Sequence, residues 1–195
     1  MVKNTQEKRS EKLKQQILDT ALEIGLQEGF EALSIRKITK KMQYSTGIIY
    51  HHFKNKQEII DAIVAVESQS FSNQILKLLD DKKDVITNME TIFHYISILA
   101  FKEPEKYNLV VTRKYSSPKA ERPIWIHQLS EFLKKGIQDG LIRKIDPDKA
   151  AFSIWSSFLG FNLMISRTSD LTLTEVEAMF RVQFDLITKG ILYNR

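Results

Sequence analysis

The stretch that decides the fold is SIRKITKKMQYSTGIIYHHF, residues 34–53. Apolar residues recur three or four positions apart within residues 34–42 and again within residues 45–53, which predicts two short helices. Gln43 and Tyr44 lie between them in a tight turn, and a serine stands at the start of each helix, where it can cap the first turn. Two short helices joined in this way are typical of a helix-turn-helix.

The two predicted helices have one apolar face and one face suited to DNA. We expect the apolar side chains of Ile38, Ile49 and Phe53 to pack against a preceding helix, which begins near Ser10 and ends at Gly29. The exposed face of the second helix then carries small, hydroxylic or aromatic side chains, namely Ser45, Thr46, Ile48, Tyr50, His51 and His52. A helix that enters the major groove needs side chains of this kind.

Charge is distributed unevenly along the chain. The first 60 residues hold 11 Lys and Arg against 7 Asp and Glu, so they carry +4 of the net charge of +5. Asp and Glu are absent from residues 32–57, where phosphates can be met by Lys37, Lys40, Lys41, Lys54 and Lys56. A basic surface can also serve solubility alone, but such a surface usually mixes both signs. The acid-free window therefore favours an anionic partner for this part of the chain.

The composition of the 195 residues is that of a globular, helical protein. Hydrophobic residues make up 43%, while 7 Gly and 4 Pro are too few for a turn-dense β-sandwich or barrel. Helical spacing and the positions of the breaks predict about nine helices and no strand, hence an all-α fold, with Thr174 and Glu177 forming a capping box at the last helix. The absence of Cys excludes a disulfide scaffold and thiol catalysis.

No segment of the sequence is typical of targeting to a membrane. The N-terminal residues are charged and lack the apolar stretch of a signal peptide. No apolar run approaches the roughly 18 residues that a membrane span needs. We therefore expect a cytoplasmic protein without a membrane partner.

Two C-terminal segments are apolar around more than one face. Residues 150–165 are apolar nearly all round, and the last helix exceeds a single apolar stripe. Two such helices per chain predict a four-helix interface in a homodimer, although the core of a well-buried monomer would give the same pattern. The candidate interface residues are Ile154, Phe161, Ile165, Met179, Val182 and Ile187.

Aromatic residues are concentrated in the last two thirds of the chain. Some of them can line a cavity for an apolar or amphipathic small molecule, while others belong to plain core. The candidate ligand-binding residues are Phe93, Trp125, Phe132, Trp155, Phe158 and Asn162, with His94, His127 and Gln128 as further polar contacts.

Signatures of catalysis are missing from the sequence. The four histidines do not have the spacing of a helical metal site; they are His51, His52, His94 and His127. No phosphate-binding Gly-rich loop, nucleophile elbow or dinucleotide fingerprint occurs. We therefore expect no metal, no cofactor, no catalytic residue and no enzymatic activity.

Residues 29–60 resemble the DNA-binding domain of TetR-type (TetR/AcrR) transcriptional regulators. The matching residues are Gly29–Phe30, Ser34–Ile35, Ile38, Ser45, Gly47, Ile49–Tyr50, His52–Phe53 and Lys54–Asn55–Lys56. The resemblance implies a helix-turn-helix domain over residues 1–55 and a helical effector-binding and dimerisation domain over residues 56–195. It also implies a homodimer built on the last two helices, an operator of double-stranded DNA and a small-molecule effector.

The resemblance also implies roles for individual residues. Phosphate contacts are expected from Ser34, Tyr50 and Lys56. Base-edge contacts are expected from Arg36, Thr46, Gly47, Ile48 and His51, with Arg36 placed for a bidentate contact to guanine. Ser45 and Lys54 complete the predicted DNA-binding set. The sequence departs from the family pattern at Gln43, where a glycine is usual, and at Ile48, where a small polar residue is usual.

These features predict a sequence-specific transcriptional regulator, namely a repressor that a small apolar or amphipathic ligand releases from a near-palindromic operator. The alternative is a helical ligand- or partner-binding protein whose basic end has only nonspecific affinity for DNA, and Gln43 and Ile48 support this alternative. Sequence-specific binding to DNA distinguishes the two functions.

Overall fold

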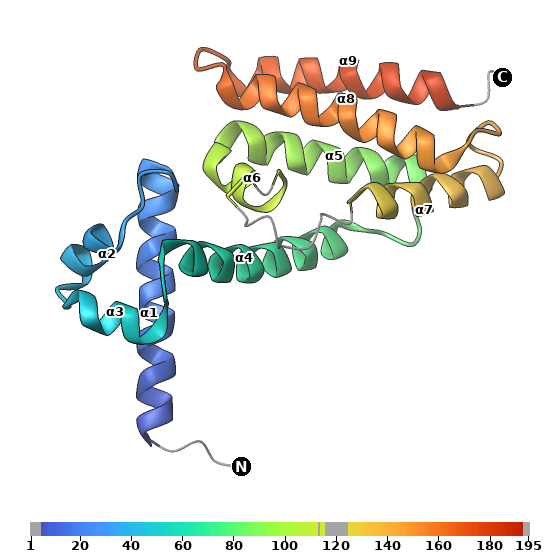
Figure 1. Ribbon diagram of the computed structural model, residues 1–195. Coiled ribbons are helices and arrows are strands. Elements are labelled where there is room, and N and C mark those ends of the chain that lie inside the picture. The colour runs from blue at the N-terminus through green and yellow to red at the C-terminus, as the bar shows by residue number, and fades with distance from the viewer. Residues whose placement is uncertain (1–4, 113, 116–124, 193–195) are drawn as a thin grey trace. The chain divides into compact units, whose positions relative to one another are not determined.

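The computed structural model describes residues 5–112, 114–115 and 125–192. Within these residues the chain forms nine α-helices and no strand, so the predicted all-α fold is confirmed (Figure 1). The helices are α1 (Thr5–Glu28), α2 (Ile35–Met42), α3 (Thr46–His52), α4 (Lys56–Leu78), α5 (Val85–Lys102), α6 (Pro104–Val110), α7 (Trp125–Gln138), α8 (Pro147–Arg167) and α9 (Leu173–Ile191). An isolated bridge between Ile142 and Leu192 is the one β-type pairing in the described ranges.

The helices are divided between two compact units. The first unit comprises Met1–Ser70 and Asn108–Glu121, and the second comprises Phe71–Tyr107 and Arg122–Arg195. The limits of the units fall inside α4 and inside α6, so each of these two helices contributes residues to both units. The functional boundary at residue 55 stays a prediction. Among the helices that the structure describes, none has the length and the apolar character that crossing a bilayer requires.

The core of the first unit lies between α1 and the α2–α3 pair. Buried apolar side chains come from all three helices and from the residue after α3; they are Ile17, Ala21, Ile24, Ile38, Ile49 and Phe53. The predicted packing of the helix pair on α1 is therefore confirmed. The ring of Phe30 lies over Gly25, where an added Cβ would come within 2.4 Å of it. This close approach requires a glycine in α1.

The core of the second unit is built around α5, which packs against α7, α8 and α9. Phe93 of α5 stacks on Phe158 of α8 with ring centroids 4.2 Å apart. Phe184 of α9 meets the same Phe93 ring edge-on at 6.2 Å. Aromatic pairs of this geometry contribute about 0.5–1.5 kcal/mol each beyond the area that they bury.

The start of α9 differs from the prediction, because Thr172 and not Thr174 caps this helix. Thr172 Oγ1 accepts the N–H of Glu175 at 3.3 Å, and the Glu175 carboxylate accepts the N–H of Thr172 at 2.7 Å. The pairs Thr172–Glu175 and Thr174–Glu177 have the same spacing, so the pattern alone does not distinguish them. With Thr172 as the cap, an apolar residue, Leu171, precedes the cap and the fully buried Val176 is the fourth helical residue, which is the apolar pairing typical of a helix start.

Gln43 ends α2 in the left-handed region of the backbone, with φ of 58° and ψ of 36°. The N–H groups of Gln43 and Tyr44 both bond to the carbonyl of Thr39, the second at 3.1 Å. Glycine is usual at such a helix end because a Cβ is crowded in this conformation. The prediction that Gln43 occupies a glycine position is therefore confirmed.

Substitutions of Gln43 measure the strain in this turn. Gln43→Val should lower the free energy of unfolding by about 1–2 kcal/mol, because a β-branched side chain is poorly suited to positive φ. Gln43→Gly should stay within about 1 kcal/mol of wild type, since it relieves crowding but makes the unfolded chain more flexible. Urea unfolding followed by circular dichroism measures both. An equal loss in both variants would mean that the side chain of Gln43, and not its backbone, supports the turn.

Candidate nucleic-acid interface

The helix α3 buries one face and presents the other to solvent. Ile49 is fully buried in the core beneath α3. The exposed residues are Ser45, Thr46, Gly47, Tyr50 and His51, while Ile48 and His52 are half-buried. Tyr50 is 56% exposed, so most of its ring is available to a partner. The rotation of α3 therefore turns most of the predicted DNA-facing residues outward.

The two serines that precede the short helices behave differently. Ser34 caps α2, since its Oγ accepts the N–H of Lys37 at 3.2 Å. Ser45 makes no such side-chain bond, and its carbonyl oxygen instead accepts the N–H of Ile48 at 3.2 Å. The prediction that the Ser45 side chain caps α3 is wrong, because the backbone closes this first turn. The exposed Ser45 hydroxyl is left for another partner.

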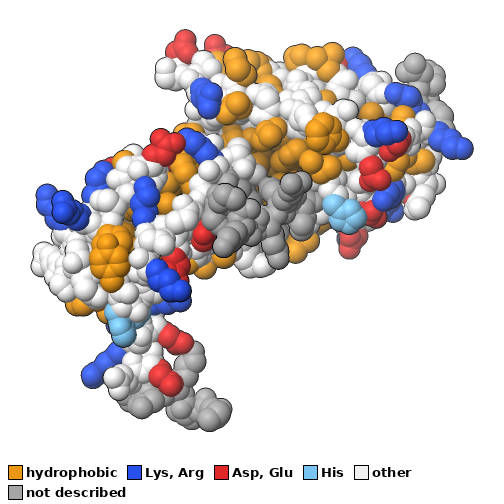
Figure 2. All heavy atoms as spheres, viewed as in Figure 1, with side chains coloured by type: hydrophobic (Ala, Val, Ile, Leu, Met, Phe, Trp, Pro, Cys, Tyr) orange, Lys and Arg blue, Asp and Glu red, His pale blue; other side chains and the backbone are white. Residues whose placement is uncertain are grey.

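Basic side chains surround α2 and α3 (Figure 2). Two of them are paired with acids of α1: Lys37 Nζ lies 2.6 Å from a Glu28 carboxylate oxygen, and Lys41 Nζ lies 2.6 Å from a Glu23 oxygen. The exposed basic residues that form no ion pair with any described residue include Arg36, Lys40 and Lys54. These three keep their charge available for an anionic partner.

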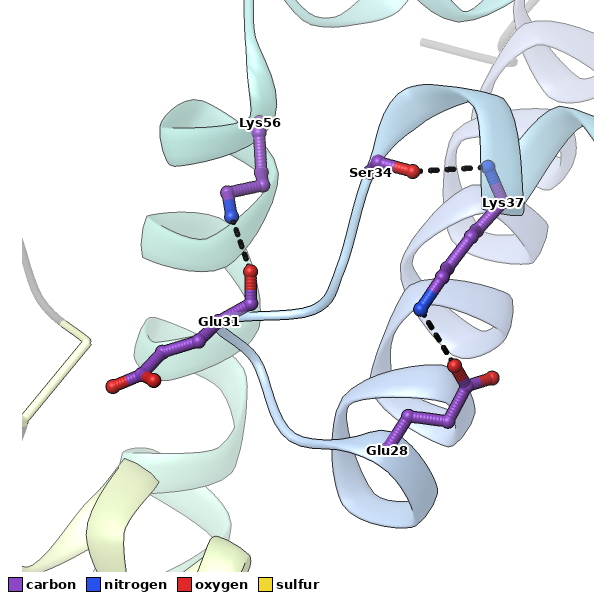
Figure 3. A network of polar contacts seen from close by, with 5 residues as sticks. All are labelled: Glu28, Glu31, Ser34, Lys37 and Lys56. Atoms are coloured by element: carbon purple, nitrogen blue, oxygen red, sulfur yellow. Dashed lines mark hydrogen bonds and ion pairs between the residues drawn. The ribbon is translucent and has the colours of Figure 1, made fainter.

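A polar network joins the loop between α1 and α2 to the start of α4 (Figure 3). Lys56 Nζ donates to the carbonyl oxygen of Glu31 at 3.1 Å. The Glu31 carboxylate pairs with Lys114 at 2.8 Å, which lowers the pKa of Glu31. Lys56 therefore has a partner within its own chain. An ammonium group has three N–H donors, so Lys56 can keep this bond and also donate to a phosphate.

The two histidines of α3 meet edge to face, with ring centroids 5.2 Å apart. Burial lowers the pKa of His52, and the charges of His51 and Lys14 lower it further. His52 is therefore neutral at neutral pH. In the described ranges, no three His, Asp or Glu side chains are placed together to hold a metal ion.

The second unit contains a cavity of about 320 Å³ among α4, α5, α7 and α8. Its wall includes four of the six predicted ligand-binding residues, which are Phe93, Trp125, Phe132 and Trp155. His127 and Gln128 also line the cavity, whereas His94 does not and lies edge-on to Phe180 at 5.2 Å. The other two predicted residues, Phe158 and Asn162, are buried in the core and do not line the cavity.

The aliphatic part of the cavity wall was not predicted from the sequence. It consists of Ile75, Leu76, Leu79, Met89, Ile92, Ile96 and Leu129. Aliphatic residues at helical spacing look the same whether they face a cavity or a packed core, so the sequence carries no signal for them. Leu76 is 64% exposed, which places this residue where the cavity meets the surface.

Exposed apolar side chains follow α8 and α9. On α9, Met179, Val182 and Leu186 are spaced by three and then four residues, and they are 36%, 61% and 65% exposed. Phe152 and Met164 of α8 are 61% and 69% exposed. The three residues of α9 lie on one face, because spacings of three and four bring side chains to the same side. Phe152 and Met164 are twelve residues apart, so they lie about 120° apart around α8.

Two of the predicted interface residues face the core of their own chain instead. Ile154 is 6% exposed and Ile165 is 3% exposed, so neither side chain is available to a partner. Phe161 and Ile187 are half-buried. In a helix that is apolar on both sides, residue type alone does not tell which side is turned inward. The register of α8 in the folded unit decides it.

Residues 17–63 match the family model of bacterial regulatory proteins, tetR family. A similar protein over a longer stretch is the biofilm operon icaADBC HTH-type negative transcriptional regulator IcaR of Staphylococcus epidermidis. It is 25% identical over 139 residues, which are 71% of this chain and 72% of that protein.

Two solved structures share the fold over most of the chain. A TetR-family transcriptional regulator from Pectobacterium atrosepticum gives a TM-score of 0.73 at 18% identity, covering 98% of this chain and 99% of that one. SmeT, the repressor of the Stenotrophomonas maltophilia multidrug efflux pump SmeDEF, gives 0.72 at 19% identity, covering 93% and 91%. A complex of SmeT with triclosan also has this fold.

Gly47 has no packing reason to be a glycine. It lies in the first turn of α3, where an added Cβ would meet only Ser45 Oγ, at 3.9 Å. Gly47→Ala should raise the free energy of unfolding by about 0.5–1 kcal/mol, because Ala is the better helix former. It should also weaken DNA binding by about tenfold, or about 1.4 kcal/mol, because the added methyl group keeps DNA from the backbone.

Urea unfolding and fluorescence anisotropy with labelled DNA measure these two effects. Gln138→Ala in α7 is the control, since this exposed helical position lies outside the predicted DNA-binding and interface residues and Ala is again the better helix former. The control should gain stability without losing affinity for DNA. Unchanged DNA binding by Gly47→Ala would remove Gly47 from the interface.

Proposed function

This chain belongs to the TetR family of DNA-binding transcriptional regulators, and from that premise we propose that it is a repressor whose affinity for its operator is controlled by a small ligand. The observation that carries the proposal is the α2–α3 pair, whose outward residues are exposed within the acid-free window of residues 32–57. Two similar proteins support repression, since IcaR is a negative regulator and SmeT is a repressor.

We assign base contacts to α3 and to the start of α2. These residues are Arg36, Thr46, Gly47, Ile48 and His51, and the flanking phosphate contacts are Ser34, Ser45, Tyr50, Lys54 and Lys56. The exposure of Arg36 supports a bidentate contact to guanine, which would contribute about 1–3 kcal/mol of discrimination between bases. Ile48 is half-buried and apolar, so it suits a thymine methyl group.

The cavity of the second unit is the proposed effector site. Its aromatic and aliphatic wall suits an apolar or amphipathic molecule, and the triclosan complex of the similarly folded SmeT supports such a ligand. A ligand changes operator affinity only if it prefers one conformation of the protein. Because α4 and α6 contribute to both units, we propose that they carry this change to the DNA-binding unit.

We propose that α8 and α9 form the interface of a homodimer through their exposed apolar residues. On α8, every fourth residue from Phe152 to Met164 is exposed, and the two between them, Ser156 and Gly160, are small. Small side chains let two helices approach closely. A twofold dimer would place its two recognition helices about one turn of DNA apart, roughly 34–36 Å, on a near-palindromic operator.

Selection from a random-sequence DNA pool, followed by sequencing, tests the proposed function. We expect an enriched near-palindrome whose binding weakens steeply with salt. Arg36→Ala should relax the preference at one base pair, whereas Tyr50→Ala should weaken binding to all sequences about equally. Salt-sensitive binding without an enriched motif would instead support a helical ligand- or partner-binding protein with only nonspecific DNA affinity.

A charge on the exposed face of α9 tests the proposed dimer. Val182→Asp should yield monomers, because it places a carboxylate in an apolar interface. Light scattering after size-exclusion chromatography measures the mass. The control is Gln138→Asp, which adds the same charge at an exposed position of α7. Dimers that persist in Val182→Asp would place the interface elsewhere.

A further inference from the structure

Four residues of the second unit have buried side-chain polar atoms that lack partners, namely Ser97, Tyr107, Trp125 and Asn162. Trp125 lines the cavity, whereas the other three residues do not. Ser97 of α5, Tyr107 of α6 and Asn162 of α8 are each 0% exposed. Their four polar side-chain atoms, Ser97 Oγ, Tyr107 OH, Asn162 Nδ2 and Asn162 Oδ1, have no hydrogen-bond partner among the residues that the structure describes. Such groups lose their bonds to water without replacement, so they destabilise the fold unless something binds them.

Ser97, Tyr107 and Asn162 are here named the polar cluster. Two of them, Ser97 and Asn162, lie at the same height along the packed helices α5 and α8. α5 and α8 pack together and run in the same direction (Figure 1), and Phe93 stacks on Phe158. Ser97 follows Phe93 by one turn and Asn162 follows Phe158 by one turn, so these two residues are neighbours as well. Burial raises the pKa of Tyr107, and a polar interaction with the Asn162 side chain lowers it in part, although the two groups do not meet in hydrogen-bond geometry.

The polar cluster adjoins the cavity. Phe93 and Ile96 form part of the cavity wall, and Ser97 is the next residue of α5. The stacked rings of Phe93 and Phe158 therefore separate the apolar cavity from the polar cluster. None of the three cluster residues lines the cavity, so a molecule in the cavity would reach Asn162 only if the Phe93 ring moved aside.

We propose that the polar cluster is the hydrogen-bonding end of the effector site and takes the neutral polar group of an amphipathic ligand, such as a hydroxyl, carbonyl or amide. The three side chains are uncharged, so a carboxylate or an ammonium group would lose its hydration there without gaining an opposite charge. An amide and two hydroxyls offer both donors and acceptors, which suits a neutral group. This inference rests on the proposed effector site and adds the chemistry of its ligand.

Three matched probes test the inference, namely 4-butylphenol, butylbenzene and 4-butylbenzoate. They differ only in carrying a neutral hydroxyl, no polar group or a carboxylate. The chain has two tryptophans, Trp125 and Trp155, and both line the cavity, so quenching of their fluorescence reports binding. We expect 4-butylphenol to bind about tenfold more tightly than butylbenzene, and 4-butylbenzoate to bind more weakly than either.

Asn162→Leu separates a ligand contact from a structural role. This variant should bind 4-butylphenol and butylbenzene equally, and its midpoint of urea unfolding should rise, because two unpartnered buried polar atoms are removed. Tyr107→Phe should change both quantities in the same direction to a smaller extent. A structural role for Asn162 would instead lower the unfolding midpoint.

Asn88 offers a matched control, since it is a buried asparagine whose amide has partners. Asn88 Nδ2 donates to the Asp80 carbonyl oxygen at 3.0 Å, and Asn88 Oδ1 accepts the Asp80 N–H at 3.0 Å. Asn88→Leu should lower the unfolding midpoint and leave the preference for 4-butylphenol unchanged. Loss of that preference in Asn88→Leu as well would overturn the assignment to the polar cluster.

The outcomes distinguish the inference from the function on which it rests. If none of the probes binds, the proposed effector site fails and the inference fails with it. If 4-butylphenol and butylbenzene bind equally to the wild type, only the inference fails. A crystal structure with the phenol hydroxyl on Asn162 would support it, whereas water on Asn162 and the hydroxyl elsewhere would make the polar cluster a hydration site and overturn it.

Discussion

The burial of Ile38 and Ile49 in the core that α1, α2 and α3 share is the constraint on which the DNA-facing surface depends. Helices of eight and seven residues, such as α2 and α3, have little stability on their own. They therefore persist because their apolar faces are covered. The same burial sets the rotation of each helix, and this rotation turns Arg36, Thr46 and His51 to the surface. The close approach of the Phe30 ring to Gly25 holds the chain that leads from α1 into α2.

In the second unit, the packing of the cavity wall and of the core depends on one ring, that of Phe93. It lines the cavity, and it also packs on Phe158 and Phe184 in the core. A side chain that belongs to both the cavity wall and the core links occupation of the cavity to packing among α5, α8 and α9. Interiors are close-packed, so a displaced ring must shift its neighbours. The polar cluster next to Phe93 adds buried groups that gain from a hydrogen-bonding partner.

Within the described residues, the chain passes between the units through two helices. α4 passes from the first unit to the second after Ser70, and α6 passes between them after Tyr107. A helix resists bending because its backbone hydrogen bonds are continuous. Tyr107 belongs to the polar cluster, and residues 109–111, which follow it closely, are buried.

Local patterns in the sequence were sufficient for the helix-turn-helix and the all-α fold, because helical spacing and turn chemistry depend on near neighbours. The glycine-type turn at Gln43 came from the family resemblance, and four of the predicted aromatic residues line the cavity. The sequence also showed directly that residues 32–57, which include α3, contain no Asp or Glu. Only the tertiary structure decided that Ile154 and Ile165 are turned inward, that Lys37 and Lys41 pair with acids of α1, and that Thr172 caps α9. The tertiary structure alone assembled the aliphatic wall of the cavity, and it alone brought the three residues of the polar cluster near one another. These features depend on how each helix is rotated against residues far away in the chain, and that rotation is set by the packing of the whole unit.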